Sequence, residues 1–393
     1  MARSGLACRV PVLWVCGPPG VGKSTVSWQL YTELAGAGVP VAFADSDQLA
    51  MCYPAPAGDP GRQHVKALNV GSVIPGFRSA GARCVIVNGV LDAGGLDTAL
   101  LPGAEVTICR LRADAGEVER RLLGRDERGS LAGLRIGDQI GRLDDSRFAD
   151  ACVDTTGVLA DDVAGLVRAA CPDWPGFTGD LRDAAGQPAH RPGPPSGGHV
   201  ALITGPTGVG KSTIGFLVYQ RCLTAGLTAG YVDLGQIGFV EPADAGDPGH
   251  HRLRARNLAA IWRNYQAAGA THLVAVGAIG TQADSGRYSD LLRGAGVMLI
   301  RLRAGSDDLR RRIMSRGAGG SWPEPGDRLR GRPAGFLGAL ADRVIADQVI
   351  ADQVSQEAEA RGRADGEGAA IDTTARSPDE SADAIARALG WLP

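Results

Sequence analysis

Two short glycine-rich segments carry the residue types that bind phosphate. GPPGVGKST (17–25) and GPTGVGKST (205–213) both fit the pattern G-x-x-x-x-G-K-[ST], each after an apolar run and before a helical one. Glycines there let backbone N–H groups turn around phosphate oxygens, and the following helix N-terminus adds positive potential. The lysine charge meets the terminal phosphates, and the serine hydroxyl completes the shell of Mg²⁺. The sequence therefore predicts two sites for a nucleoside triphosphate with Mg²⁺.

The two segments supply matching sets of predicted ligands. The nucleotide-binding residues are Gly17, Gly20, Gly22, Lys23, Ser24 and Thr25 in the first, and Gly205, Gly208, Gly210, Lys211, Ser212 and Thr213 in the second. We expect ATP and Mg²⁺ as cofactors, with Ser24 and Ser212 on the metal. Only three of the 41 basic residues are lysines, and two of these are the loop lysines. A compact ammonium fits among phosphate oxygens where a broad guanidinium does not.

The chain is an internal duplication. The two glycine-rich segments are related by a shift of 188 residues, and at the same shift PAPAGDPG (54–61) matches PADAGDPG (242–249). Near the ends of the copies, VDTTG (153–157) resembles IDTTA (371–375), so the second copy is longer. We predict a first domain over 1–176, a Pro/Gly-rich linker over 177–198, and a second domain over 199–393.

Short apolar runs alternate with helical segments in each copy. Runs rich in β-branched residues, separated by helices of about 10–15 residues, predict a parallel sheet with helices on both faces. Five strands per copy is the expected count. The second copy also contains IADQVIADQV (345–354) and a polar continuation to 369, which predict a helix that frays into a loop.

Composition narrows the function classes. The charges nearly balance, 41 Lys+Arg against 43 Asp+Glu, which disfavours a protein that binds nucleic acid or an acidic membrane surface. No apolar run approaches the ~20 residues of a membrane span. The eight cysteines contain no CxxC pair and no metal-ligand spacing with histidine, which is typical of a reduced cytoplasm. We expect a cytoplasmic protein; the sequence does not predict its oligomeric state.

Carboxylates distinguish the two copies. Copy one reads ADSDQL, with Asp45 and Asp47 at the end of the second predicted strand, where such sheets bind ligands. One of them could take the proton of the acceptor's hydroxyl group or hold Mg²⁺ through water. The alternative is a turn in which the aspartate side chain hydrogen-bonds its own backbone. Copy two keeps Asp233 but has Gly235 in place of Asp47. Neither third strand ends in an acidic residue.

These motifs resemble the P-loop nucleoside triphosphatases, and within them the small kinase group of adenylylsulfate kinase, gluconate kinase and chloramphenicol phosphotransferase. The resemblance covers both copies, apart from the linker and residues 345–369. It implies an α/β fold of two tandem P-loop kinase-like domains, each with a five-stranded parallel sheet in the order 2-3-1-4-5. It also implies transfer of the ATP γ-phosphoryl group to a small acceptor.

The resemblance places arginines in a lid after the fourth strand. In copy one these are Arg121, Arg125 and Arg128, and in copy two Arg312 and Arg316. Guanidinium groups there would neutralise charge on the transferred phosphoryl group. Arginines that complete a helix macrodipole are the alternative.

The predicted helix after the Gly/Pro loop carries basic residues, among them Arg62 and Lys66. They would either grip an anionic acceptor or form a solvated basic face.

Two function hypotheses follow from these patterns. The first is a Mg²⁺-dependent kinase for a small metabolite or nucleotide, with Lys23, Asp45, Asp47, Arg121 and Arg125 as catalytic residues of domain 1. Its partners would be the nucleotide and the acceptor, without a membrane or a specific nucleic acid. The alternative is a tandem nucleotide-binding switch or regulatory ATPase without small-molecule kinase activity.

Overall fold

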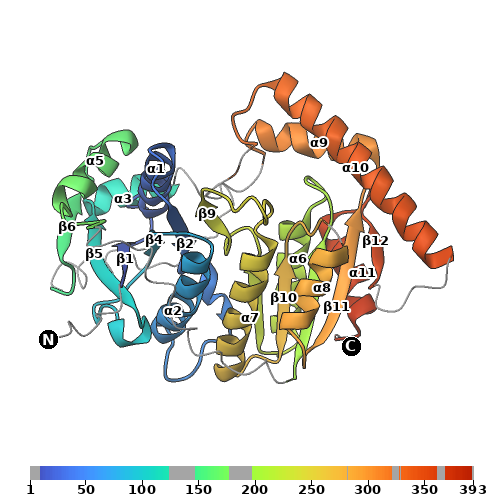
Figure 1. The fold of residues 1–393 in the computed structure, drawn as a ribbon, viewed down its shortest axis with the longest axis horizontal. Coiled ribbons are helices and arrows are strands. Elements are labelled where there is room, and N and C mark those ends of the chain that lie inside the picture. The colour runs from blue at the N-terminus through green and yellow to red at the C-terminus, as the bar shows by residue number, and fades with distance from the viewer. Residues whose placement is uncertain are drawn as a thin grey trace, which may run out of the picture. The chain divides into compact units, whose positions relative to one another are not determined.

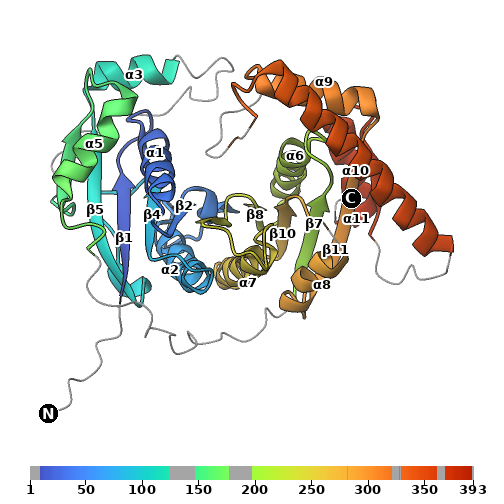
Figure 2. The ribbon, with the colours of Figure 1, turned by 45° about the horizontal axis from the view of Figure 1, so that its top comes forward.

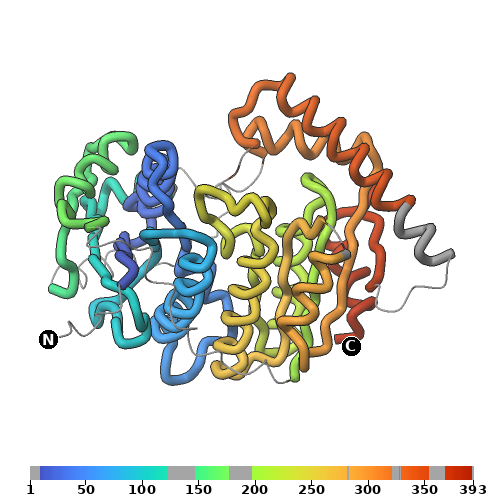
Figure 3. Tube along the Cα trace, in the orientation of Figure 1, coloured from blue at the N-terminus to red at the C-terminus, as the bar shows by residue number. Residues whose placement is uncertain are grey.

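A computed structural model describes most of the chain in two compact units. The described residues are 9–123, 147–176, 197–280, 282–320, 327, 329–360 and 368–391 (Figure 3). Unit 1 comprises Met1–Ala50, Ala55–Gly193 and Gln236–Asn264, and unit 2 comprises Met51–Pro54, Pro194–Gly235 and Tyr265–Pro393. Each unit therefore includes a segment from the other sequence repeat. The domain boundaries at 176 and 199 that the sequence repeat indicates stay a prediction. Of the predicted linker over 177–198, residues 177–196 lie outside the described residues.

The sheet of unit 1 has six strands in the order β6-β5-β1-β4-β2-β9 (Figure 1). Their bounds are β1 (Val10–Cys16), β2 (Val41–Asp45), β4 (Cys84–Gly89), β5 (Ala104–Arg112), β6 (Ala151–Asp154) and β9 (Phe239–Glu241). The first five are parallel, whereas β9 from the second repeat pairs antiparallel with β2. Counted among themselves, the parallel strands run 2-3-1-4-5.

The sheet of unit 2 repeats this plan in the order β12-β11-β7-β10-β8-β3. Its strands are β7 (His199–Thr204), β8 (Ala229–Asp233), β10 (His272–Val276), β11 (Gly296–Arg303), β12 (Ala370–Asp372) and β3 (Cys52–Tyr53). Here the antiparallel edge strand β3 comes from the first repeat. The exchange of edge strands between the repeats is therefore reciprocal.

The α/β class is confirmed, but the expectation of wholly parallel five-stranded sheets is wrong. Each sheet is mixed, because a sixth, antiparallel strand closes the edge beside β2 or β8. These edge strands span only three and two residues. Runs this short show no alternation that distinguishes a strand from a loop, so the sequence did not reveal them.

Helices flank both sheets. In unit 1 these are α1 (Lys23–Gly36), α2 (Gln63–Ser79), α3 (Ala115–Leu123) and α5 (Ala160–Ala170), with the short 3-10 helices η1 (Gln48–Ala50) and η2 (Thr98–Leu100). Helix α7 (His251–Ala267) lies in unit 1 up to Asn264. Unit 2 contains α6 (Lys211–Thr224), α8 (Gln282–Leu291), α9 (Ser306–Gly317), α10 (Ala334–Ala360) and α11 (Pro378–Leu389). All residues of β1, β2 and β4 are buried, as expected of strands covered on both faces.

The predicted helix at 345–354 lies within α10. Gln348, in the first of the two five-residue repeats, donates to the carbonyl of Ala304 and accepts from its amide, which ties α10 to the end of β11. Across the described ranges, no helix combines the length and apolarity needed to cross a bilayer.

Strand β9 is anchored in unit 1 by aromatic packing. The Phe239 ring lies 5.0 Å from that of Trp28 on α1 and 5.8 Å from that of Phe43 on β2, in edge-to-face geometry. Tyr31 completes the cluster. A residue of the second repeat thus fills part of the core of the first unit.

Phe239→Ala should destabilise unit 1. Phe239 is partly buried, so we expect a loss of about 2 kcal/mol in the free energy of unfolding, below the range for fully buried phenylalanines. Urea unfolding gives the total loss, and hydrogen exchange of the β2 amides locates it. The control is Leu159→Ala, because Leu159 is 74% exposed and should be nearly neutral. Unchanged β2 protection in Phe239→Ala would contradict the anchoring role.

Candidate functional site

The two glycine-rich segments form tight loops between the first strand of each repeat and the helix that follows. Gly17 and Gly205 have φ angles of 145° and 150°. A Cβ atom at either position would collide with the carbonyl oxygen of the neighbouring strand, at Leu111 or Leu302. Glycine is therefore required where the loop passes across β5 or β11, which holds its amides at the carboxyl edge of the sheet.

The loop lysines are the first residues of α1 and α6. Lys23 donates to the carbonyl of Pro18 at 3.0 Å, and Lys211 donates to those of Gly205 and Pro206 at 3.0 and 2.9 Å. Burial lowers the pKa of Lys23, with Asp47 and Asp45 opposing this shift, and lowers the pKa of Lys211 to about 8. Each loop thus contains a largely desolvated ammonium, which an anionic ligand would stabilise.

In unit 1 three side chains meet beside the loop. Asp45 ends β2 directly opposite Asn88 on β4, and Asn88 Nδ2 donates both to Asp45 Oδ2 at 2.9 Å and to Ser24 Oγ at 3.1 Å. Asp45 Oδ1 accepts from the amides of Asp47 and Gln48. Burial, with the charge of Asp47, raises the pKa of Asp45 to about 6. Asn88 thus joins the loop serine to a carboxylate that is more basic than an ordinary aspartate.

Asp47 joins the same edge to helix α2. Its Oδ1 lies 2.7 Å from Lys66 Nζ, and its Oδ2 accepts from the amide of Val90 at 3.1 Å. The Lys66 side chain is only 4% exposed, against 39% for Asp47, and its ammonium also donates to the Val90 carbonyl. Lys66 is therefore a buried partner of Asp47 and does not belong to a solvated basic face. Arg62 likewise donates to a backbone carbonyl, that of Ala50.

Unit 2 has a simpler arrangement at the equivalent place. Asp233 lies opposite Val276 in the register that pairs Asp45 with Asn88, so no amide stands between Asp233 and the loop serine. Ser212 Oγ donates directly to Asp233 Oδ2 at 2.8 Å, and Asp233 Oδ1 accepts from the Gly235 amide. Gly235 has no carboxylate to correspond to Asp47. The two sites share the loop and differ in the polar groups beside it.

The first lid arginine of each repeat is held by backbone and hydroxyl groups. Arg121 donates to Thr155 Oγ1 and O at 3.2 and 2.8 Å and forms an ion pair with Glu117. Thr155 in turn donates to the loop carbonyl of Val21. Arg121 therefore lies beside the phosphate loop, with its guanidinium bound to protein groups.

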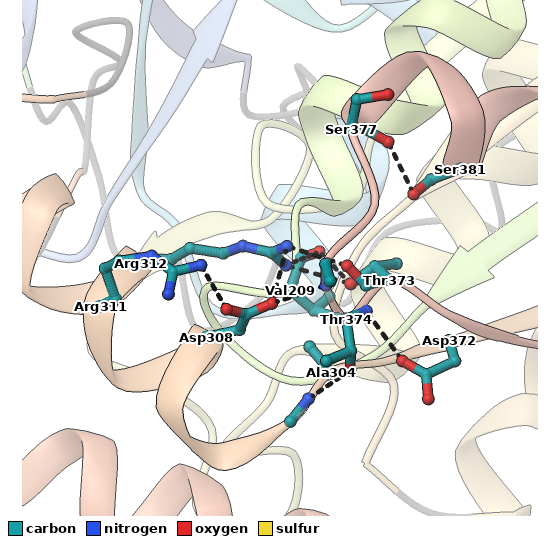
Figure 4. Close-up of polar contacts among 12 residues, drawn as sticks. Val209, Ala304, Asp308, Arg311, Arg312, Asp372, Thr373, Thr374, Ser377 and Ser381 are labelled. Atoms are coloured by element: carbon teal, nitrogen blue, oxygen red, sulfur yellow. Dashed lines mark hydrogen bonds and ion pairs between the residues drawn. The ribbon is translucent and has the colours of Figure 1, made fainter.

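The network of unit 2 is equivalent (Figure 4). Arg312 donates to Thr373 Oγ1 and O, both at 3.0 Å, and to the loop carbonyl of Val209 at 3.2 Å. The second arginine, Arg316, binds Asp327 at 2.9 Å and helps to lower the pKa of Lys211. Its counterpart in the first repeat, Arg125, and Arg128 lie outside the described residues.

The structure thus brings together many of the predicted site residues and adds two. Lys23, Ser24, Asp45 and Asp47 gather at one edge of unit 1, as do Lys211, Ser212 and Asp233 in unit 2. The sequence reasoning missed Asn88, and it did not pair Lys66 with Asp47. An asparagine at the end of an otherwise apolar strand was the available signal for the first. The second depends on the fold, since 19 positions separate the two residues.

Oxygen atoms in unit 1 suit a Mg²⁺ ion. Ser24 Oγ and the Asp45 carboxylate are hard oxygen ligands, and Asn88 Oδ1 is buried without a hydrogen-bond partner among the described residues. Within those residues, no group of three or more His, Cys, Asp or Glu side chains could hold a metal by itself. The oxygen atoms of Ser24, Asp45 and Asn88 are of the kind that Mg²⁺ prefers, and this ion usually binds through one or two carboxylates together with phosphate oxygens and waters.

Comparison with solved structures finds proteins that are similar to about half of this chain. No protein family and no curated protein matches the sequence. A sugar kinase from Janibacter sp. matches 44% of this chain and 99% of its own, at 16% identity and a TM-score of 0.34. The tunicamycin resistance protein of Deinococcus radiodurans matches 50% and 97%, at 20% identity and 0.32. The Mycobacterium tuberculosis APS kinase, solved with AMPPNP and APS, matches 50% and 99%, at 20% identity and 0.30.

The chain resembles small P-loop kinases. Each of these matches spans about half of this chain and nearly all of the other protein.

Lys66→Met tests the buried ion pair. It leaves the Asp47 carboxylate without its cation, and we expect a loss of about 1–2 kcal/mol in the free energy of unfolding, reduced from the fully buried case because Asp47 is partly exposed. Lys66→Met with Asp47→Asn should recover part of this loss. The control Arg112→Met breaks an ion pair that is half-exposed on both sides and should cost under about 1 kcal/mol. Equal losses in both single variants, by urea unfolding, would contradict the assignment.

Proposed function

We propose that the protein is an ATP- and Mg²⁺-dependent phosphotransferase for a small hydroxyl-bearing acceptor, with the site of unit 1 as the catalytic one. The main support is the hydrogen-bonded set of Ser24, Asn88 and Asp45 beside the Asp47–Lys66 ion pair. Unit 2 lacks this set, because Val276 and Gly235 stand in place of Asn88 and Asp47. Unit 2 keeps the phosphate loop, so we propose that it binds nucleotide without efficient transfer. The proposed location is the cytoplasm.

Each group of unit 1 has a role that follows from its position. The loop amides and Lys23 bind the β- and γ-phosphates. Ser24 and Asp45 would hold Mg²⁺, directly or through water, and the ion would offset negative charge on the phosphates. Asp47 is the more exposed carboxylate, so we propose that it orients the acceptor hydroxyl and takes its proton. Arg121 and Arg125 are proposed to stabilise charge on the transferred group.

The charges near Asp47 indicate whether the acceptor is neutral or anionic. The ammonium of Lys66 is neutralised by Asp47, and Arg62 is directed at a backbone carbonyl. Two of the basic residues expected to grip an anion thus have protein partners. A neutral hydroxyl compound therefore suits this edge better than an anionic one.

A tandem nucleotide-binding switch is the second candidate. It is favoured by unit 2, where Val276 and Gly235 replace the amide and the carboxylate while the loop is retained. On this hypothesis neither unit transfers phosphate to a small molecule, and nucleotide occupancy alone changes the behaviour of the chain.

Phosphoryl transfer from labelled ATP to a pool of metabolites separates these candidates. We expect acceptor-dependent transfer by the wild type, a fall of at least 10²-fold in Lys23→Ala, and little change in Lys211→Ala, because only the first lysine serves the catalytic site. Nucleotide binding to each variant is the control. No transfer despite tight binding would refute the kinase proposal, and loss in Lys211→Ala alone would assign catalysis to unit 2.

Asn88→Val should make the first site resemble the second. It removes the amide between Ser24 and Asp45, so we expect transfer to fall by about 10–100-fold, with the free energy of unfolding changed by no more than about 3 kcal/mol. The matched control is Val276→Asn, which adds the amide to unit 2 and should leave transfer at unit 1 unchanged. Full activity in Asn88→Val would show that the amide is not needed.

A further inference from the structure

Helix α7 of the second repeat packs beside α2 of the first within unit 1 (Figures 1 and 2). Two asparagines join them, since Asn264 Nδ2 donates to Asn69 Oδ1 at 2.9 Å. The same nitrogen lies 2.9 Å from Ser72 Oγ, one turn of α2 further on. A polar side chain of the second repeat thus binds the middle of a helix of the first.

Asn69 links Asn264 to the backbone next to the candidate site. It is fully buried, and its Nδ2 donates to the carbonyl of Leu49 at 2.6 Å. Because Asn264 donates to the amide oxygen of Asn69, the amide nitrogen must face Leu49. Leu49 lies in η1, which directly follows the Asp45–Asp47 turn.

The same helix also carries the cation of the site. Lys66 is three positions before Asn69, so both lie on one side of α2. While Asn69 fixes η1, Lys66 binds Asp47 itself. Helix α2 thus contacts the segment 45–50 at two points, through Lys66 and Asn69. Asn264 of the second repeat in turn binds α2 at Asn69.

The pseudo-symmetric position lacks this support. Asn257 corresponds to Asn69 and donates to the carbonyl of Ile237 at 2.8 Å, as Asn69 does to Leu49. The counterpart of Asn264, however, is Gly76, where a Cβ atom would collide with Asn257 Oδ1. The side-chain bridge between α2 and α7 therefore serves only the first repeat, whose turn carries both Asp45 and Asp47.

We propose that Asn264 of the second repeat is a positioning residue for the first site, acting through Asn69 on η1 and on the Asp47–Lys66 pair. The inference rests on the proposed function for its catalytic meaning. On this proposal the second repeat not only contains a glycine-rich loop of its own but also helps to position the residues of the first site. The route consists of one buried and one partly buried amide hydrogen bond and one ion pair.

The scarcity of lysine provides a direct assay on the full chain. Lys23, Lys66 and Lys211 are its only lysines, so acylation by an amine reagent, followed by mass spectrometry, reports each position separately. In Asn264→Ala we expect Lys66 to react about tenfold faster, because loss of the bridge frees α2 to leave the Asp47 turn. Lys211 in unit 2 should react at the wild-type rate.

Two comparisons distinguish positioning from general loosening of α7. Asn257→Ala removes a buried asparagine of the same helix whose amide donates to the carbonyl of Ile237 and not to Asn69, and it should leave the reactivity of Lys66 unchanged. In the double variant Asn69→Ala/Asn264→Ala, Lys66 should react no faster than in Asn69→Ala, because both residues act on one route. Unchanged Lys66 reactivity in Asn264→Ala, equal acceleration in Asn257→Ala, or fully additive effects would each overturn the proposal.

The kinetics of phosphoryl transfer provide a second test of the positioning role. Asn264→Ala should raise KM for the acceptor several-fold and leave KM for ATP unchanged, because the phosphate loop is not on the route. If Asn264→Ala fails to fold, Asn264→Asp keeps the size of the side chain and removes both donated hydrogens. Acylation needs neither nucleotide nor transfer, so it tests the positioning role even if the kinase proposal fails.

Discussion

Desolvation of an ammonium group at each glycine-rich loop is the constraint on which the other features of both sites depend. Lys23 and Lys211 donate to loop carbonyls, and desolvation lowers the pKa of each. A buried cation is tolerated when oxygen atoms surround it, which explains why carboxylates end the neighbouring strands β2 and β8. In unit 1 this places Asp45 and Asp47 near Lys23, and Lys66 then offsets the second carboxylate. The charges of the site thus form one balanced set.

The same constraint shows how duplicated sites can diverge without loss of the fold. The loop, the strand register and the arginine–threonine network are common to both units. At the carboxyl edge the side chains differ, since Asn88 becomes Val276 and Asp47 becomes Gly235. Val276 is fully buried in the core of unit 2, so there an apolar side chain takes the place of the amide while the strand register is kept.

Sequence patterns predicted what depends on local spacing. The loops, the parallel strands and the aspartates at the end of β2 all follow from motif and alternation, and the structure places them together. The pairing of Asp47 with Lys66, the role of Asn88 and the bridge from Asn264 to Asn69 depend on side chains that the fold brings together. Arg62 and Lys66 show the limit clearly. Helical spacing allowed an anion grip or a solvated face, whereas the structure directs Lys66 to Asp47 and Arg62 to a carbonyl.

The exchanged edge strands follow from a general property of sheets. An exposed edge presents unpaired N–H and C=O groups, and pairing β9 with β2 and β3 with β8 covers one edge in each unit. A duplicated chain keeps the donor of each edge strand at a high effective concentration, so three residues or even two suffice for pairing. Helix α7 follows β9 in the same segment of the second repeat, Gln236–Asn264, which belongs to unit 1 and brings α7 to α2. The contact between Asn264 and Asn69 is therefore a consequence of how the duplicated chain closes its sheets.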